Sequence, residues 1–125
     1  MYMKTTDMAL IGIYEIEMRH IIARTGILSE HLGWTKQKTC RILDELTDAG
    51  MINRMKTAFF TLTKKGIRRA DTLLLATRNL SYILENIGID KDNSNVYANA
   101  IASELTVSDA NTLAKWLPNE GSNLS

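Results

Sequence analysis

The chain of 125 residues has little of what often identifies a function at first sight. Cys40 is its single cysteine, which excludes an internal disulfide and a cysteine-based zinc cluster. No apolar run is long enough to span a bilayer, and the first residues lack the basic start and small-residue cleavage site of a signal peptide. We therefore expect a chain without a membrane partner in a reducing, cytoplasmic compartment.

Recognisable enzyme motifs are missing as well. The sequence has no glycine-rich phosphate loop, no histidine or cysteine paired with a plausible orienting group, and no familiar pair of carboxylates. His20 and His31 are read as ordinary surface or partly buried side chains, and Cys40 as an unremarkable thiol rather than a redox switch. With 45% hydrophobic and 23% charged residues the composition is that of a globular protein. We predict that the chain is not an enzyme and has no cofactor.

The net charge of +1 conceals an asymmetry along the chain. Residues 1–70 carry 12 Lys plus Arg against 7 Asp plus Glu, whereas residues 71–125 carry 3 against 7. Within 36–69 the balance is 9 basic to 3 acidic residues. Such a cluster indicates contact with a phosphate backbone, the alternative being a merely solvated face.

A helix-turn-helix pattern occupies residues 27–54. Leu28 and Leu32 share one face of a short helix, Gly33 allows a turn with positive φ, and Thr35 can cap the next helix. In that second helix the positions expected to face the core are Thr39, Ile42, Leu43 and Leu46. The positions expected to point outward are Gln37, Arg41, Asp44 and Asp48.

A β-hairpin is predicted directly after this helix. Gly50 ends the helix, apolar residues alternate over 51–56, Lys56 to Ala58 makes a plausible tip, and 59–62 returns before Thr63 caps a new helix. The alternative is that two short helices and a hairpin merely follow one another without forming a winged helix. Here their order and the three-residue turn favour a winged helix.

Further helices flank this unit. The first is expected from about Thr6 to Ala23 and is apolar nearly all round, so it must be covered on more than one side. A long helix is expected from Lys64 to about Ile87, where Gly88 breaks it.

Two short helices should complete the chain. Residues 90–94 read as a polar loop, 95–104 as a helix, and Thr106 with Asp109 as the capping box of a last helix that ends near Leu117, before Pro118. The predicted fold is therefore mainly α. Its expected domains are a winged helix-turn-helix DNA-binding domain (1–70), an all-helical dimerisation region (71–118) and a flexible tail (119–125). The alternative is that the last helices only complete a monomeric core.

Together these elements resemble the diphtheria-toxin-repressor family of metal-dependent repressors, especially its shorter, manganese-responsive branch without an SH3-like domain. The segments that carry the resemblance are IYEI at 13–16, the helix-turn-helix with DELTDAGMI, LTKKG at 62–66, LSYILENIGID at 80–90 and ANAIASELTVSD at 98–109. The resemblance implies a homodimer built through the C-terminal helices and a recognition helix that enters the major groove of double-stranded DNA.

The metal ligands of that family are not conserved in this chain. By the resemblance, the carboxylate pair, the long-helix histidine and the Glu-x-x-Glu-His group fall on Met8, Ile11, Thr77, Asn99, Ala102 and Ser103. None is a good ligand for manganese or iron, which take carboxylate oxygens or imidazole. Asp7 lies one residue off, but no histidine follows residue 31 to complete the group. We expect no metal site, and regulation without metal or through an unknown effector.

DNA contacts are predicted at the start and outer face of the recognition helix, in the wing and behind it. Gln37 and Arg41 suit base edges, and Thr35 suits a base edge or a phosphate. The expected phosphate contacts are Lys36, Lys38, Arg54, Lys56, Lys64 and Lys65, with Arg68 and Arg69 less certain. We therefore interpret the chain as a dimeric, sequence-specific transcriptional regulator. The alternative is a winged helix that binds a protein partner instead of DNA.

Overall fold

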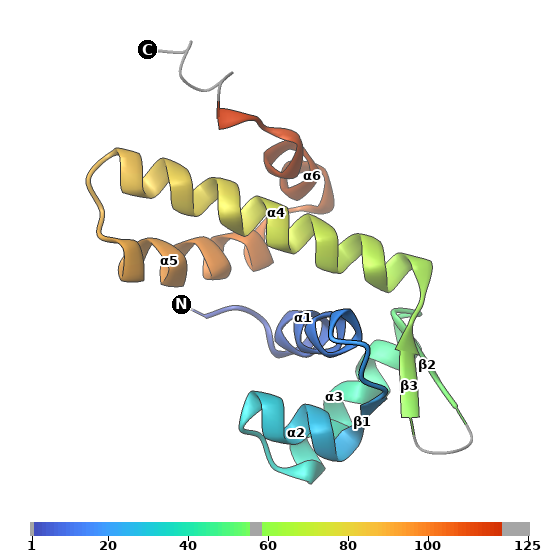
Figure 1. Cartoon of the computed structure of the whole chain (residues 1–125). Helices are drawn as coiled ribbons and strands as arrows, with labels where there is room; N and C mark the ends of the chain where they lie inside the picture. The colour runs from blue at the N-terminus through green and yellow to red at the C-terminus, as the bar shows by residue number, and fades with distance from the viewer. Residues whose placement is uncertain (1, 56–58, 119–125) are drawn as a thin grey trace. The chain divides into compact units, whose positions relative to one another are not determined.

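The computed structural model describes residues 2–55 and 59–118, and it divides the chain into two compact units. One unit is Thr5–Ala70 and the other comprises residues 2–4 and 71–118 of the described chain. The helix α4 (Lys64–Asn86) contributes to both (Figure 1). Each unit is described by itself.

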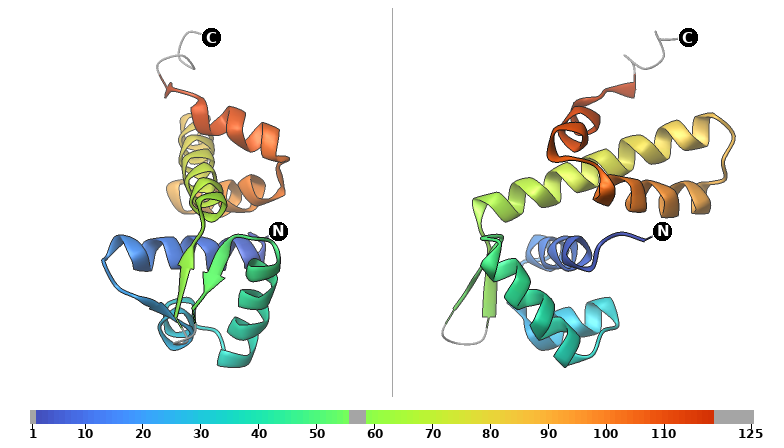
Figure 2. Two further views of the ribbon diagram at one scale, coloured as in Figure 1. Left: turned by 90° about the vertical axis from the view of Figure 1, so that its right-hand side faces the viewer. Right: turned by 180° about the vertical axis from the view of Figure 1, so that it is seen from behind.

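The first unit is a winged helix. Its elements in chain order are α1 (Thr5–Met18), β1 (Ala23–Arg24), α2 (Thr25–Leu32), α3 (Lys36–Asp48), β2 (Ile52–Arg54), β3 (Phe59–Leu62) and the start of α4. Figure 2 shows α2 and α3 beside each other and the two strands of the hairpin side by side. The mainly helical, winged helix-turn-helix fold predicted from the sequence is confirmed.

The sheet has one strand more than the sequence predicted. Its order is β1-β3-β2, with β3 antiparallel to both neighbours. Ala23 pairs with Phe60, and Ile52 pairs with Leu62. These four residues are buried, because they lie on the face of the sheet that meets the helices. The predicted first helix to Ala23 is therefore wrong at its end, where the chain is already extended.

The first helix stops early at a left-handed turn. His20 has a φ of 60°, its N–H donates to the Glu17 carbonyl at 2.9 Å, and the Ile21 N–H donates to the Ile16 carbonyl at 3.3 Å. This pair of bonds is a Schellman ending, in which a left-handed residue satisfies the last carbonyls of the helix. Glycine usually takes that place, and histidine tolerates it better than most residues. The apolar Ile21 and Ile22 suggested continuation, but the backbone turns before them.

The core of the first unit lies where α1, α2, α3 and the sheet meet. Its fully buried side chains include Leu10, Ile13, Leu28, Leu43 and Phe60, each at most 1% exposed. The four inward positions predicted for the recognition helix are all buried, and its four predicted outward positions are all exposed. Helical periodicity therefore sets which side of α3 is free to meet a partner.

The second unit consists of the rest of α4, α5 (Lys91–Glu104) and α6 (Val107–Lys115). The predicted loop at 90–94 is wrong: Asp90 caps α5 by accepting from the Asn93 N–H at 2.8 Å, so the polar residues form its first turn. The predicted cap of α6 is confirmed, because the Thr106 side chain accepts from the Asp109 N–H at 3.1 Å. The predicted tail at 119–125 lies outside the described residues.

Small buried residues hold the helices of the second unit together. Ala76, Ala98, Ala102 and Ala110 are fully buried, and Asn79 is 1% exposed. The Asn79 amide donates to the carbonyls of Leu113 and Trp116, at 2.6 and 2.9 Å, and so satisfies the end of α6.

Candidate nucleic-acid interface

The turn of the helix-turn-helix has the predicted geometry. Gly33 ends α2 with a φ of 69°. The Thr35 side chain accepts from the Lys38 N–H at 3.1 Å and so caps α3. Ser29 and Thr39 join the two helices from inside, through a buried hydroxyl–hydroxyl bond of 2.9 Å. The Thr35 hydroxyl accepts only this one bond from the backbone and is exposed, so its O–H can still donate to a partner.

The first half of α3 presents the side chains best suited to bind DNA. Lys36, Gln37 and Arg41 are exposed there. The partial positive charge of a helix N-terminus reinforces the two basic side chains toward a phosphate. Lys38 lies over the ring of Trp34, with Nζ 4.6 Å from the ring centroid, so its ammonium is held at the turn by a cation–π contact.

The second half of α3 is acidic. Asp44, Glu45 and Asp48 are all exposed and would repel a phosphate backbone. Arg54 on β2 pairs with Asp44, with Nη1 2.5 Å from Oδ1. The wing thus neutralises one of these carboxylates. The same bond means that Arg54, which the sequence suggested as a phosphate contact, is already paired.

Two further basic residues of the predicted set lie just behind the hairpin, at the start of α4. Lys64 is exposed at the start of α4. Lys65 is exposed too, and its Nζ donates to the Ala49 carbonyl at 2.9 Å, at the end of α3. Lys56 lies outside the described residues. The structure thus brings most of the predicted basic set onto the winged helix, but two of its members, Arg54 and Lys65, already have partners within the protein.

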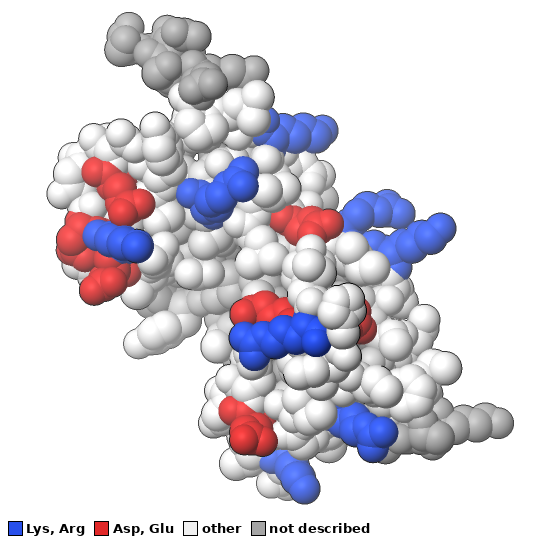
Figure 3. All heavy atoms as spheres, viewed as in Figure 1, with Lys and Arg blue, Asp and Glu red and all other residues white. Residues whose placement is uncertain are grey.

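Charge is mixed on one face of the molecule. On the face shown in Figure 3, basic and acidic side chains are interspersed, with no continuous field of one sign. Bulk charge on this face therefore does not by itself indicate a partner.

The residues at the positions of the family's metal ligands do not fit a metal ion. Ala102 is fully buried and apolar, and the Asn99 amide donates to the Asn95 carbonyl at 2.8 Å. The Ser103 hydroxyl accepts from the Lys4 N–H at 2.9 Å. Thr77 Oγ1 is the one buried side-chain polar atom that lacks a partner among the described residues. A neutral hydroxyl and an amide are weak donors for manganese or iron compared with the carboxylates and imidazole that those ions select.

Asp7, the carboxylate nearest to those positions on α1, already has a cation. The Arg69 guanidinium on α4 meets it with two bonds, Nε to Oδ1 at 3.3 Å and Nη2 to Oδ2 at 3.1 Å. The side chains of Asp7 and Arg69 are only 9% and 19% exposed. A bidentate arginine occupies both carboxylate oxygens, so Asp7 is not a free metal ligand. It also removes Arg69 from the possible phosphate contacts.

Elsewhere in the described ranges, the side chains that could bind a metal ion are dispersed. Between residues 2 and 118, with 56–58 left aside, no three His, Cys, Asp or Glu side chains gather as a metal would require. In the same ranges, no helix has the length and apolar character needed to cross a membrane.

Several proteins of solved structure share this fold. No protein-family profile and no curated sequence matches the chain. Solved structures do match, among them the manganese regulator SloR, with a TM-score of 0.71 and 19% identity over 88% of this chain and 52% of that one. The chain has the fold of the metal regulators of the diphtheria-toxin-repressor family. It spans about half the length of SloR.

Two further solved structures are similar to the chain over most of its length. The metal-dependent transcriptional regulator MtsR has a TM-score of 0.72 and 16% identity over 89% of this chain and 52% of that one. The hypothetical protein SSo2273 from Sulfolobus solfataricus has a TM-score of 0.70 and 21% identity, over 89% of this chain and 85% of that one. At these identities the comparisons show the fold that the sequence predicted, whereas residue roles must be argued from the site itself.

Sequence reasoning missed the two arginine–carboxylate pairs described in this unit. Asp7 and Arg69 stand 62 positions apart, and Asp44 and Arg54 stand 10 apart across a helix end and a turn. Neither separation is a helical or cross-strand spacing that a sequence pattern reveals. The excess of basic residues between 36 and 69 was a usable signal, but it does not say which of them are already paired.

Proposed function

We propose that the protein is a dimeric, sequence-specific DNA-binding transcriptional regulator whose DNA binding does not depend on metal. The observation that carries the proposal is the exposed first half of α3, where Lys36, Gln37 and Arg41 stand on the outer face of a winged helix-turn-helix. In helix-turn-helix proteins the N-terminal residues of the second helix contact base edges in the major groove. The structural neighbours include proteins described as transcriptional regulators, which supports the same role.

Base reading is assigned to Gln37 and Arg41, and backbone contact to Lys36 and Lys64. Glutamine matches the donor–acceptor pair of adenine, and arginine matches the two acceptors of guanine. An amine on a flexible stem serves a phosphate as a point charge. Acids in the second half of α3 favour an approach by its first half, with Arg54 offsetting Asp44.

The test measures the affinity of the protein for genomic fragments that it selects and for random duplex DNA, each over a range of salt concentrations. Arg41→Ala should cost about 1 to 3 kcal/mol on the selected site and little on random DNA. Lys64→Ala should weaken both and reduce the salt slope by about one. Lys115→Ala, an exposed basic change on α6, is the matched control and should leave both unchanged. If Arg41→Ala acts equally on both DNAs, base reading by Arg41 is wrong.

The proposed dimer forms through the second unit. Its exposed apolar side chains include Ile87 at 71%, Val96 at 54%, and Tyr82 and Tyr97 at 44% each. Large apolar groups on neighbouring helices are typical of an interface, and two-fold dimers match palindromic operators. In light scattering after gel filtration, Ile87→Asp should shift the protein toward monomer. Met18→Asp, a similar change at an exposed position at the end of α1, should not. A wild-type monomer at micromolar concentration would contradict the proposal.

Independence from metal is supported by the unsuitable ligand set and by the Asp7–Arg69 pair. Where metal-dependent relatives require an ion, this chain would reach its DNA-competent state without one. Affinity for a selected fragment should therefore be the same in a chelator and in added manganese or iron. A stoichiometric metal requirement would refute this part of the proposal and leave DNA binding itself standing.

A second candidate is a winged helix that binds a protein partner. The observations that favour it are the exposed acids Glu45 and Asp48 on α3 and the use of Arg54 within the protein. The affinity of a protein for DNA falls steeply as the salt concentration rises, because binding releases the cations that are condensed on the duplex. Binding to DNA that is absent, or insensitive to salt, would favour this candidate.

A further inference from the structure

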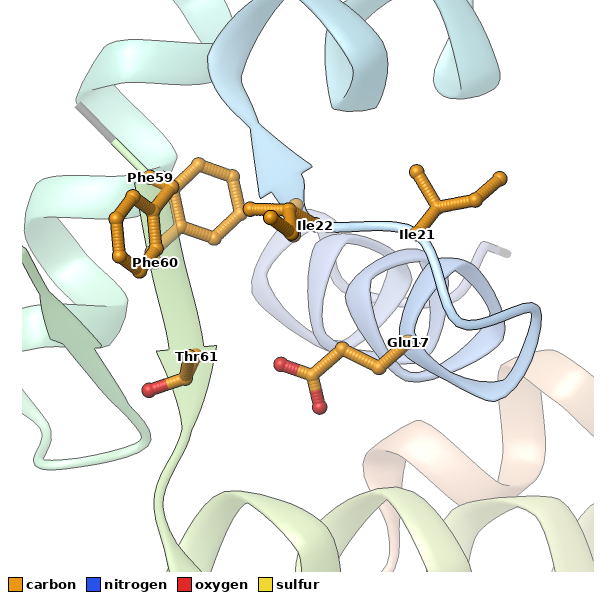
Figure 4. Close-up of a pocket in the computed structure, with 7 residues that line it drawn as sticks. Glu17, Ile21, Ile22, Phe59, Phe60 and Thr61 are labelled. Atoms are coloured by element: carbon orange, nitrogen blue, oxygen red, sulfur yellow. The ribbon is translucent and has the colours of Figure 1, made fainter. Parts of the chain in front are cut away.

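A small cavity of about 290 Å³ opens beside the three-stranded sheet, within the winged-helix unit. Its volume is near the lower end of the range of roughly 300 to 1,000 Å³ typical of small-molecule sites. The residues that line it come from the end of α1, the following turn, β1 and β3 (Figure 4). They are Glu17, Ile21, Ile22, Ala23, Phe59, Phe60 and Thr61.

The walls of this cavity are predominantly apolar and aromatic. Phe60 is almost fully buried and Phe59 is half-buried, while Ile22 is 57% exposed at the rim. Figure 4 shows the Ile22 side chain directed toward the phenylalanine rings and Ile21 directed away from them. Apolar walls retain a hydrocarbon body, and aromatic rings also attract a cation.

Glu17 supplies the charge. It is the one ionisable side chain among the seven residues that line the cavity. Its Oε1 accepts from the Leu62 backbone N–H at 3.1 Å, a bond that directs the carboxylate toward β3 (Figure 4). That bond uses one lone pair of one oxygen, and a carboxylate has about four acceptor sites. The half-buried carboxylate therefore retains acceptor capacity at the side of an apolar space.

We propose that this cavity binds a small organic cation, an ammonium group carried on an arylalkyl or alkyl body. The ammonium meets Glu17 and the aromatic rings, and the body lies against Ile22 and Phe59. An anion would meet the carboxylate unfavourably, and a neutral molecule of the same shape would forgo the charged contact. The site is independent of whether the chain binds DNA.

The experiment is calorimetric titration of the full chain with 2-phenylethylammonium and with 2-phenylethanol, which is nearly the same shape without the charge. The ammonium should bind about tenfold more tightly than the alcohol. Glu17→Gln should abolish most of that difference, because glutamine keeps an acceptor for the Leu62 N–H and removes the charge. Circular dichroism of this variant should match the wild type.

Two further variants locate the site. Ile22→Glu, at the exposed rim, places a second carboxylate beside the cavity and should tighten the ammonium several-fold while leaving the alcohol unchanged or weaker. Val107→Glu adds the same charge at an exposed position on α6, which does not line the cavity, and should have little effect. Equal binding of the ammonium and the alcohol, no binding of either at millimolar concentration, or full binding by Glu17→Gln would each overturn the proposal.

Discussion

Breaking the buried ion pair between α1 and α4 should destabilise the winged helix much more than breaking the exposed one. Asp7 and Arg69 are 9% and 19% exposed, whereas Arg54 and Asp44 are 39% and 66% exposed. Removing one partner of a fully buried pair costs about 3 to 5 kcal/mol, and exposed pairs contribute about 0 to 1 kcal/mol. Since Arg69 retains some contact with solvent, we expect Arg69→Met to cost about 2 to 4 kcal/mol.

The measurement is urea unfolding followed by tryptophan fluorescence. Trp34 lies in the winged-helix unit and Trp116 in the other, so a Trp116→Phe background reports the unit that contains the pair. Arg54→Met is the matched control and should cost less than about 1 kcal/mol. Asp7→Asn, made once with Arg69 intact and once with Arg69→Met, completes a double-mutant cycle. The coupling energy between Asp7 and Arg69 should exceed about 1 kcal/mol.

Two outcomes would refute the reasoning. If Arg69→Met costs no more than Arg54→Met, burial is not what makes the first pair strong. If the cycle shows no coupling, the loss comes from packing of the arginine stem rather than from the ion pair.

Three shorter predictions concern backbone, hydroxyls and metal. Gly66→Ala should destabilise strongly, by more than about 3 kcal/mol, because the added Cβ would collide with the Met51 carbonyl oxygen. Gly26→Ala on α2 meets open space and should stabilise by about 0.4 to 1 kcal/mol in the same urea assay. Thr77→Val removes a buried hydroxyl without a partner and should be neutral or stabilising, whereas Thr39→Val breaks its bonds to two neighbours and should cost about 1 to 3 kcal/mol. Added manganese should leave the melting temperature of the wild type unchanged, and a saturable rise would contradict the proposal that the chain binds no metal.

The sequence predicted the fold well where a local signal had one structural meaning. Three helices end in the same Schellman arrangement with a glycine of positive φ, at Gly33, Gly50 and Gly88, and glycine is the usual residue there. The first helix ends in the same way with His20. That end was mispredicted, because a histidine between apolar residues gives no comparable signal.

The remaining errors have related causes. The strand β1 has two residues. It forms because Ala23 pairs with Phe60, 37 positions away, and such a pairing has no local sequence signature. The polar run after Asp90 reads as a loop by composition, but a single capping bond is enough to begin a helix there. For the candidate site, periodicity identified which residues of α3 face outward. It did not indicate that Arg54 and Lys65 have partners inside the protein.

The base of the wing is closed by a set of bonds between the end of α3 and the start of α4. The Thr63 N–H donates to the Met51 carbonyl at 3.0 Å, its hydroxyl donates to Gly50 at 2.6 Å, and Lys65 donates to Ala49 at 2.9 Å. These bonds hold the two ends of the hairpin together at its base. Lengthening the loop between Arg54 and Phe59 leaves the core of the unit intact, since loop length costs little once its ends are fixed. Exchanging the whole hairpin would instead remove the buried Ile52, Phe60 and Leu62. The loop between the strands is thus the part of the wing that a lineage or a designer can change without rebuilding the domain, because the strands themselves belong to the core.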